Sequence, residues 1–130
     1  MATFLKALTT VYSANIAKAI DFYGRLLGFE ETYRFPYAGE PEHVEFRVGG
    51  TTLAVSSAAG LRSHGLPPAT PGHPFEIGIK TENVDAAVAE LRAAGVTVIK
   101  EPKDSAAGNR YAYVADPDGN WISLYQNLSK

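Results

Sequence analysis

The chain has 130 residues and a formal net charge of −2, which suits one domain, or two small repeats sharing a core, without the basic excess that nucleic acid or an anionic membrane requires. It has no cysteine, which excludes disulfides, thiolate nucleophiles and cysteine-based zinc sites. The start of the chain does not resemble a signal peptide, and no apolar run approaches the roughly 20 residues of a membrane span. We therefore predict a cytoplasmic protein with no nucleic-acid partner and no membrane partner.

The first half of the chain predicts a strand, a helix and three further strands. Apolar residues recur at helical spacing from Ile16 to Leu27, Ser13 or Asn15 can cap that helix, and Gly28 follows its end. Gly49-Gly50 is typical of a tight hairpin turn. The strands are expected at residues 5–12, 29–35, 43–48 and 51–57.

Residues 58–73 differ from the segments on either side. They contain three proline and three glycine residues and show no hydrophobic periodicity. Loops of this length are uncommon inside compact domains and usually serve as linkers or binding loops. We predict a linker loop over the whole segment.

The second half repeats the pattern. A strand over 75–80 precedes a helix from Asn83 to Ala94, which Gly95 ends. A strand over 96–100 and a loop over 101–108 lead into a closing hairpin, whose turn is Asp116–Asn120. The carboxylates of that turn are expected to be structural and not catalytic.

The two halves are an internal repeat. Asn15 and Asn83, at the starts of the two helices, are separated by 68 residues. Ile20 and Val88 on those helices have the same separation. Each half reads βαβββ, so we predict an α+β fold of two βαβββ modules, residues 1–57 and 74–130, which the 58–73 linker joins into one domain, 1–130.

Strand alternation sorts the side chains of four strands onto two faces. One face is almost entirely apolar and should pack under the helices; it carries Ala7, Thr9, Val11, Leu53, Val55, Phe75, Ile77, Ile79, Ile122 and Leu124. The other, the mixed face, carries Leu8, Thr10, Tyr12, Thr52, Ala54, Ser56, Glu76, Gly78, Lys80, Trp121, Ser123 and Tyr125. Exposure to water accounts for its polar members, whereas its aromatic residues and its one carboxylate favour the wall of a ligand pocket.

The segments IAKAIDFYGRLLGFE, NVDAAVAELRAAGV and DPDGNWISL, together with the double repeat, resemble the vicinal oxygen chelate superfamily. That superfamily includes glyoxalase I, extradiol dioxygenases, fosfomycin-resistance enzymes and the bleomycin- and mitomycin-binding resistance proteins. The likeness covers essentially the whole chain. It implies a cupped mixed sheet around a cavity, commonly completed in a homodimer, and we expect a homodimer here.

Metal-dependent members of the superfamily carry four ligands, two in each half. The resemblance places these positions at Leu8, Ala54, Glu76 and Ser123. Leucine and alanine cannot coordinate, serine is a poor ligand, and one glutamate does not hold a catalytic divalent ion. We therefore predict no metal and no cofactor.

The three histidines show none of the paired spacings that metal sites use, and the chain has no GxSxG nucleophile motif. His43, His64 and His73 are expected as surface or loop residues. A Ser/His/Asp arrangement built from distant parts of the sequence remains open.

Glu76 has several interpretations. A carboxylate beside apolar side chains can act as a general base or can orient a ligand's amine or hydroxyl. It can instead form a salt bridge to Lys80, Arg110 or Arg47, or be exposed.

The mixed face favours a metal-independent protein that binds a small molecule and sequesters a planar or hydrophobic compound such as an antibiotic. Trp121 would stack on that ligand. The alternative is a glyoxalase-like lyase or isomerase, or a dioxygenase-related enzyme, with Glu76 as a catalytic general base or with an atypical metal site; a structural partner protein is a third reading. The expected ligand-binding residues are Leu8, Thr10, Tyr12, Ala54, Ser56, Glu76, Gly78, Trp121, Ser123 and Tyr125.

Overall fold

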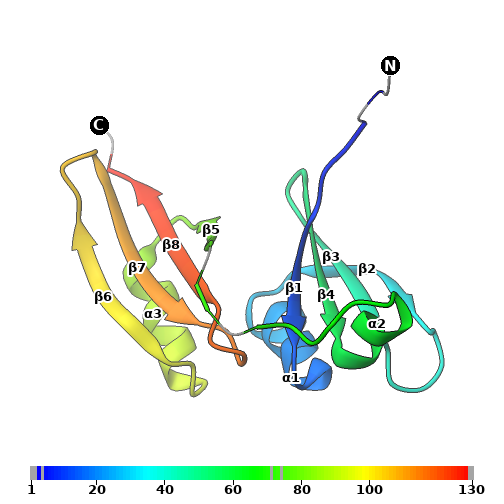
Figure 1. Cartoon of the computed structure of the whole chain (residues 1–130). Coiled ribbons are helices and arrows are strands. Elements are labelled where there is room, and N and C mark those ends of the chain that lie inside the picture. The colour runs from blue at the N-terminus through cyan, green and yellow to red at the C-terminus, as the bar shows by residue number, and fades with distance from the viewer. Residues whose placement is uncertain (1–2, 4, 71, 74, 129–130) are drawn as a thin grey trace. The chain divides into compact units, whose positions relative to one another are not determined.

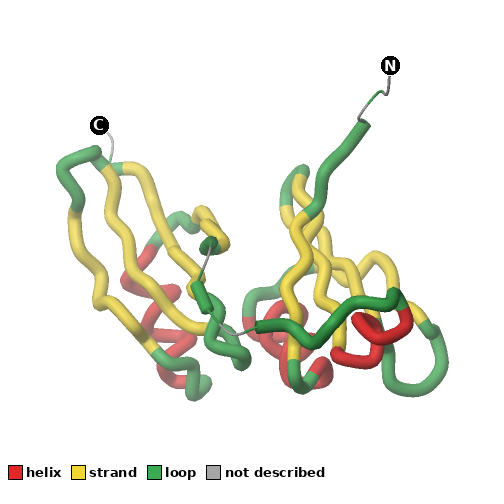
Figure 2. The backbone as a smooth tube through the Cα atoms, viewed as in Figure 1, coloured by secondary structure: helices red, strands yellow, loops and turns green. Residues whose placement is uncertain are grey.

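The computed structural model describes residues 3, 5–70, 72–73 and 75–128 and divides into two compact units, residues 1–70 and 71–130. Each unit contains one four-stranded sheet with one parallel and two antiparallel strand pairs (Figures 1 and 2). The predicted α+β class with two similar halves is confirmed. The boundary between the units falls within the segment 58–73.

The first unit has the sheet order β1-β4-β3-β2, in which β1 and β4 are parallel. Its elements are β1 (Thr9–Ser13), α1 (Ile16–Ile20), the π-helix η1 (Asp21–Leu26), β2 (Glu30–Phe35), β3 (His43–Val48), β4 (Thr51–Ser57) and α2 (Ala58–Ser63).

The helical segment of the first unit begins as predicted and then widens. Asn15 caps it by accepting a hydrogen bond from the Lys18 amide at 3.2 Å. The second half is a π-helix and not the α-helix that the periodicity predicts. Its wider turn lets the consecutive residues Phe22 and Tyr23 both be buried, and the Tyr23 ring packs between Phe22 and Phe46.

The apolar face of the first sheet is buried with this helical segment, as strand alternation predicts. Val11, Leu53 and Val55 are buried on β1 and β4, and the same face of β3 adds Val44 and Phe46. The predicted strand 5–12 is shorter than expected, because β1 begins only at Thr9.

The prediction of a loop over all of residues 58–73 is wrong, because α2 occupies its beginning. Ser57 caps α2 by accepting a hydrogen bond from the Gly60 amide at 3.1 Å, and the Ser57 amide donates to the Glu42 carbonyl at 2.9 Å. Gly60 packs so closely that a Cβ atom there would lie 2.7 Å from the Glu42 carbonyl oxygen. A helix of six residues is too short to show hydrophobic periodicity, so the pattern could not predict it.

The second unit has the sheet order β5-β8-β7-β6, in which β5 and β8 are parallel. Its elements are β5 (Ile77–Lys80), α3 (Val84–Ala93), β6 (Val98–Asp104), β7 (Asn109–Ala115) and β8 (Trp121–Asn127). Helix α3 lies against one face of this sheet, where it buries Val84, Val88 and Leu91 (Figure 1).

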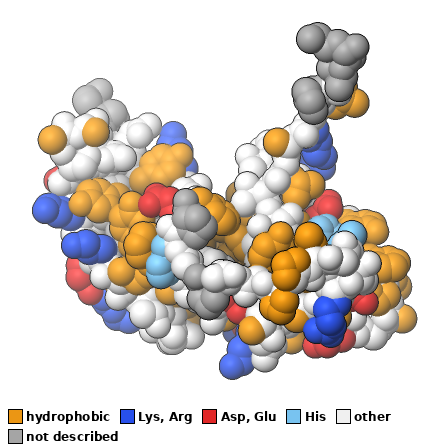
Figure 3. Space-filling model, viewed as in Figure 1, with side chains coloured by type: hydrophobic (Ala, Val, Ile, Leu, Met, Phe, Trp, Pro, Cys, Tyr) orange, Lys and Arg blue, Asp and Glu red, His pale blue; other side chains and the backbone are white. Residues whose placement is uncertain are grey.

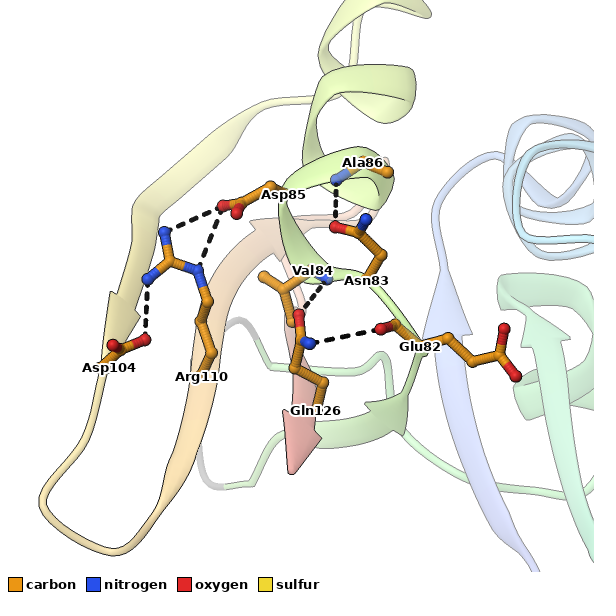
Figure 4. Close-up of polar contacts among 8 residues, drawn as sticks. All are labelled: Glu82, Asn83, Val84, Asp85, Ala86, Asp104, Arg110 and Gln126. Atoms are coloured by element: carbon orange, nitrogen blue, oxygen red, sulfur yellow. Dashed lines mark hydrogen bonds and ion pairs between the residues drawn. The ribbon is translucent and has the colours of Figure 1, made fainter. Parts of the chain in front are cut away.

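Figure 4 shows how the last strand fixes the start of α3. Gln126 on β8 accepts a hydrogen bond from the Val84 amide at 2.7 Å and donates one to the Glu82 carbonyl at 3.3 Å. Asn83 caps the helix by accepting from the Ala86 amide at 3.0 Å. The N-terminus of α3 is therefore tied both to its own cap and to the sheet.

Arg110 joins three elements of the same region (Figure 4). Its guanidinium donates to Asp85 on α3 at 3.0 Å and to Asp104 on β6 at 2.8 Å. These carboxylates raise the pKa of the Arg110 guanidinium, chiefly through the hydrogen bonds from Asp104 and Asp85. Arg110 thus has a structural role and does not form the salt bridge to Glu76 considered above.

Strand β6 runs past the predicted end at residue 100, so the prediction of a loop from 101 to 108 is wrong for residues 101–104. Pro102 lies inside it. The strand tolerates this proline because β6 is at the edge of the sheet and its pairing is irregular between Lys100 and Lys103.

The turn of the closing hairpin is held by a buried side chain. The Asp116 carboxylate accepts hydrogen bonds from the amides of Asp118 and Asn120, at 2.9 and 2.8 Å, and from the Asn120 side chain at 2.8 Å. The expected structural role of this carboxylate is confirmed.

The two units repeat the same strand register. Thr10 pairs with Ala54 in the first sheet, and Gly78 pairs with Ser123 in the second. Because Thr10 and Gly78 are 68 residues apart, the register makes Ala54 and Ser123 equivalent. Within the described part of the chain, no helix is long and apolar enough to cross a membrane.

Candidate ligand site

The mixed face of the second unit is the sheet face opposite α3. Strand pairing places these residues on it: Gly78, Lys80, Lys100, Lys103, Tyr111, Tyr113, Trp121, Ser123 and Tyr125. This grouping contains five of the six residues of the second half that the sequence assigned to the mixed face, all except Glu76, and it adds members from β6 and β7. The face is rich in aromatic rings and carries lysines on its outer strands.

The predicted strand over 75–80 begins only at Ile77, so Glu76 lies just before β5 and is exposed. Its carboxylate accepts a hydrogen bond from the Tyr113 hydroxyl, which is 3.1 Å from Oε1 and 3.3 Å from Oε2. Because β8 lies between β5 and β7 in the sheet, this contact spans β8. No lysine or arginine of the second unit, among its described residues, lies within ion-pairing distance of Glu76.

The pKa of Tyr113 is raised above the usual tyrosine value. Partial burial of the phenol is the largest cause, followed by the hydrogen bond to the Glu76 carboxylate and the negative charge of that group. Each of these disfavours the phenolate, so Tyr113 stays protonated and donates to Glu76 at neutral pH.

Trp121 is the aromatic residue expected to stack on a ligand, and one face of its indole already has a neighbour. The His73 ring is parallel to it, with the ring centroids 4.0 Å apart and the planes 5° apart. The His73 Nε2 is 3.0 Å from the Gly119 carbonyl, which fixes the imidazole over the indole. Trp121 remains 37% exposed, so part of it is accessible to solvent.

Gly78 and Ser123 lie side by side in the middle of this region. A Cβ atom on Gly78 would be 3.3 Å from the Ser123 Oγ and 3.8 Å from the Tyr125 ring. Any other residue at position 78 would place its Cβ close to the largely buried Ser123 hydroxyl, and glycine avoids this crowding.

The mixed face of the first unit lies opposite the buried core of that unit. Strand pairing places these residues on it: Thr10, Tyr12, Tyr33, Phe35, His43, Glu45, Arg47, Thr52, Ala54 and Ser56. Tyr12 is exposed, whereas the Ala54 side chain is 0% exposed and so has no surface for a ligand in this conformation. Leu8 precedes β1 and is exposed.

His43 is at the centre of a polar row on this face. Its Nδ1 is 2.9 Å from the Ser56 Oγ, and its Nε2 is 2.9 Å from the Glu45 Oε2. The Tyr33 ring meets the imidazole edge-on, with centroids 6.1 Å apart. His43 is therefore a half-buried strand residue whose two ring nitrogens both have partners, and not a free surface histidine.

The sequence profile of the Glyoxalase/Bleomycin resistance protein/Dioxygenase superfamily matches residues 7–124. The chain belongs to this superfamily. Its resemblance to the vicinal oxygen chelate proteins is thereby confirmed.

Relatives of this superfamily member occur in mycobacteria. An uncharacterized protein of Mycobacterium bovis is 33% identical over 116 residues, which cover 86% of this chain and 76% of that protein. An uncharacterized protein of Mycolicibacterium smegmatis is 32% identical over 124 residues, covering 95% and 94%. A glyoxalase/bleomycin resistance protein/dioxygenase family enzyme from Burkholderia phytofirmans shares the fold with a TM-score of 0.80 and 21% identity, covering 93% of this chain and 97% of that one.

The superfamily implies a divalent metal in its chelating members, but the four matching positions do not fit one. Leu8 and Ala54 have no donor atom, the Ser123 hydroxyl is a weak ligand, and the Glu76 carboxylate is bonded to Tyr113. Among the described residues, no group of three or more histidine, cysteine, aspartate or glutamate side chains could hold a metal ion.

Sequence reasoning missed the partners that give these faces their chemistry. His43, Glu45 and Tyr113 lie on β3 and β7, whose alternation was not used to extend the mixed face. Applying the same period of two to those strands would have placed all three on it. No sequence pattern indicated that His73 stacks on Trp121, because His73 is a loop residue 48 positions away in the sequence.

Proposed function

We propose that this chain is a metal-independent binding protein for a small planar or hydrophobic molecule, such as an antibiotic, which it holds on the mixed face of the second unit. The observation that carries the proposal is a carboxylate, Glu76, bonded to Tyr113 on a sheet face that also displays Tyr111, Trp121 and Tyr125. Aromatic surface for a flat ligand body, with one polar group to orient it, is the usual composition of small-molecule sites.

The charges on this face favour a neutral or acidic ligand. Lys80, Lys100 and Lys103 are exposed and share the face with the single carboxylate of Glu76. A strongly cationic drug such as bleomycin would meet more like charges than opposite ones there.

The fluorescence of Trp121 tests the proposal, because it is the only tryptophan in the chain. The probes are a neutral naphthoquinone, a naphthoate anion and a cationic acridine, each titrated into the purified protein. We expect saturable quenching by the quinone and the naphthoate and weaker binding of the acridine. Quenching that rises linearly with every probe would mean collisions only and would contradict the site.

Calorimetry on variants locates the site. Trp121→Ala should weaken the tighter probe about tenfold, which corresponds to roughly 1.4 kcal/mol of lost stacking. The matched control is Tyr37→Ala, because Tyr37 is a highly exposed aromatic residue of the first unit. Equal affinities of the two variants would remove Trp121 from the site.

The same site has a second interpretation, an enzyme in which Glu76 is the general base. The Tyr113 hydroxyl already approaches both carboxylate oxygens, which supports an anchoring role over proton abstraction. Glu76→Gln separates the two, since the amide still accepts a hydrogen bond but does not take a proton. Metal analysis of protein purified without chelator tests the metal-free part of the proposal, and sedimentation tests the proposed homodimer.

A further inference from the structure

The polar row on the mixed face of the first unit has the connectivity of a catalytic triad. His43 on β3 pairs directly with Ser56 on β4, and Glu45 follows two residues later on the same face of β3. The imidazole thus bridges a hydroxyl and a carboxylate, at 2.9 Å from each. The three side chains come from two adjacent strands of a sheet, which holds them in fixed register.

The chemistry of the three groups sets the direction of their hydrogen bonds. A carboxylate only accepts, so the ring nitrogen that faces Glu45, Nε2, carries the hydrogen. In the neutral imidazole, Nδ1 then carries a lone pair and accepts a hydrogen bond from the Ser56 hydroxyl. The histidine can therefore take the serine proton on one ring nitrogen while the carboxylate contacts the other. This is the arrangement of a Ser-His-acid triad, except that here Nδ1 faces the serine and Nε2 faces the acid.

The neighbours of Ser56 indicate what could bind there. Tyr12 is paired with Ser56 on one side, and Phe35 is paired with His43 on the other, so one row reads aromatic, histidine, serine, aromatic across the sheet. Both aromatic rings are exposed, and no lysine stands in this row. The surroundings suit an uncharged aromatic or short-chain acyl compound.

We propose that Ser56 is a nucleophile, activated by His43 and positioned through Glu45, that accepts an acyl group from uncharged aryl esters. The Ser56 Oγ would form a bond to the ester carbonyl carbon while its proton moves to the His43 Nδ1. The bond from that carbon to the aryloxy oxygen breaks, and the aryloxide leaves with the electron pair. The imidazolium then releases that proton to solvent. Water later attacks the seryl ester and gives a proton to the same Nδ1, which passes it to the departing Ser56 oxygen as the carboxylic acid is released. This site is in the first unit and does not depend on the ligand site proposed for the second.

The sheet also limits the rate of this reaction. Strand β4 is paired with β1 on one side and β3 on the other, so its amides around Ser56 are used in the two ladders. No amide beside the nucleophile is then available to stabilise an oxyanion, a contribution that is worth about 100-fold or more in hydrolases. We therefore expect activated esters to acylate Ser56 and the seryl ester to hydrolyse slowly.

The test uses p-nitrophenyl acetate and the full-length protein. The wild type should release a burst of about one p-nitrophenolate per chain, followed by slow turnover, and intact mass and peptide mapping should place the acetyl group on Ser56. Ser56→Ala should abolish the burst. The matched control is Thr52→Ala, which removes another hydroxyl from the same face of β4 and should keep the burst. Acetylation of His43 or of a lysine in place of Ser56, or an undiminished burst in Ser56→Ala, would overturn the proposal.

The roles of histidine and glutamate have separate readouts. His43→Gln removes the base and should slow acylation about 100-fold, at the lower end of general-base contributions. Glu45→Gln removes the negative charge opposite the imidazolium that forms during acylation, so the acylation rate at saturating ester should fall while the ester concentration at half-saturation stays the same. Tyr33 also contacts the ring, and Tyr33→Phe should leave the acylation rate unchanged. An acylation rate unchanged in Glu45→Gln would show that the carboxylate has only a structural role.

Discussion

The two units have the same sheet order and register but carry different chemistry on their mixed faces. In the first, a histidine at the start of the inner strand β3 bridges a serine and a glutamate, and aromatic side chains are paired on either side of them. In the second, the carboxylate comes from the segment before the first strand and is held by a tyrosine, while a histidine stacks on the tryptophan. The repeated framework therefore fixes where side chains point and not what they do.

Equivalent positions show this directly. Ala54 and Ser123 occupy the same place in the two registers, and Leu8 and Glu76 each lie two residues before the equivalent pair Thr10 and Gly78. In each pair, the residue of the first unit has no polar atom in its side chain and the residue of the second unit has an oxygen atom that could coordinate a metal.

The largest expected difference between the units is in the hairpins that close them. Asp116→Ala removes a buried carboxylate that accepts three hydrogen bonds, and should lower the free energy of unfolding by about 3 kcal/mol. The equivalent turn in the first unit depends on Gly49, whose φ is +57° and whose added Cβ would touch nothing within 4 Å. Gly49→Ala should therefore cost only about 1 kcal/mol. Urea denaturation measures the free energy of unfolding of both variants. Equal decreases in the two variants would contradict the expected difference between the hairpins.

The second expected effect is confined to alkaline solution. Because the pKa of Tyr113 is raised in the folded chain, its proton is lost more easily from the unfolded chain. The stabilisation is complete below the unfolded tyrosine value of about 10 and is lost as the pH rises through the higher folded value. The wild type should therefore lose more stability than Tyr113→Phe as the pH rises above about 10. Urea midpoints measured at increasing pH give the comparison, and parallel curves would contradict the raised pKa of Tyr113.

The smallest expected effect is spectroscopic. The His73 ring stacks on the Trp121 indole, so His73→Asn should expose the indole to water and move its fluorescence emission to longer wavelength, with little change in stability. His64→Asn is the control, since His64 lies in the first unit at the end of α2. An emission spectrum that is unchanged in His73→Asn would mean that the stack does not form in solution.

The fold was largely predictable because its signals are local. Strand alternation assigned most of the buried apolar side chains correctly, since burying one face of each sheet requires a period of two. Phe75, assigned to the apolar face, lies before β5 and is exposed, whereas Ala54 and Ser123 on the mixed face are buried. The sequence offered Ser13 or Asn15 as the cap of the first helix, and the structure selects Asn15, whose side chain contacts an amide three residues away. Pro102 misled the prediction, since a proline signals a strand end unless the strand is known to be at the edge of a sheet.

The candidate sites were less predictable because their decisive contacts join distant residues. Glu76 and Tyr113 are 37 positions apart, and His43 and Ser56 are 13 apart. Composition and spacing cannot show such pairs until the strand order is known. Hydrophobic side chains are exposed on the visible face of both units (Figure 3), so exposure of an aromatic residue did not by itself identify a site.

Helix α2 has a consequence for how this chain can be divided. Ser56 lies next to Ser57, the cap of α2, and His43 lies next to Glu42, whose carbonyl receives the Ser57 amide and touches Gly60. The helix therefore helps to hold the end of β4 beside the start of β3, even though its sequence is typical of a flexible linker. Anyone who expresses the first unit alone, grafts it, or permutes the chain should cut after residue 66, where the Leu66 amide makes the last contact with Leu61, and not at residue 58.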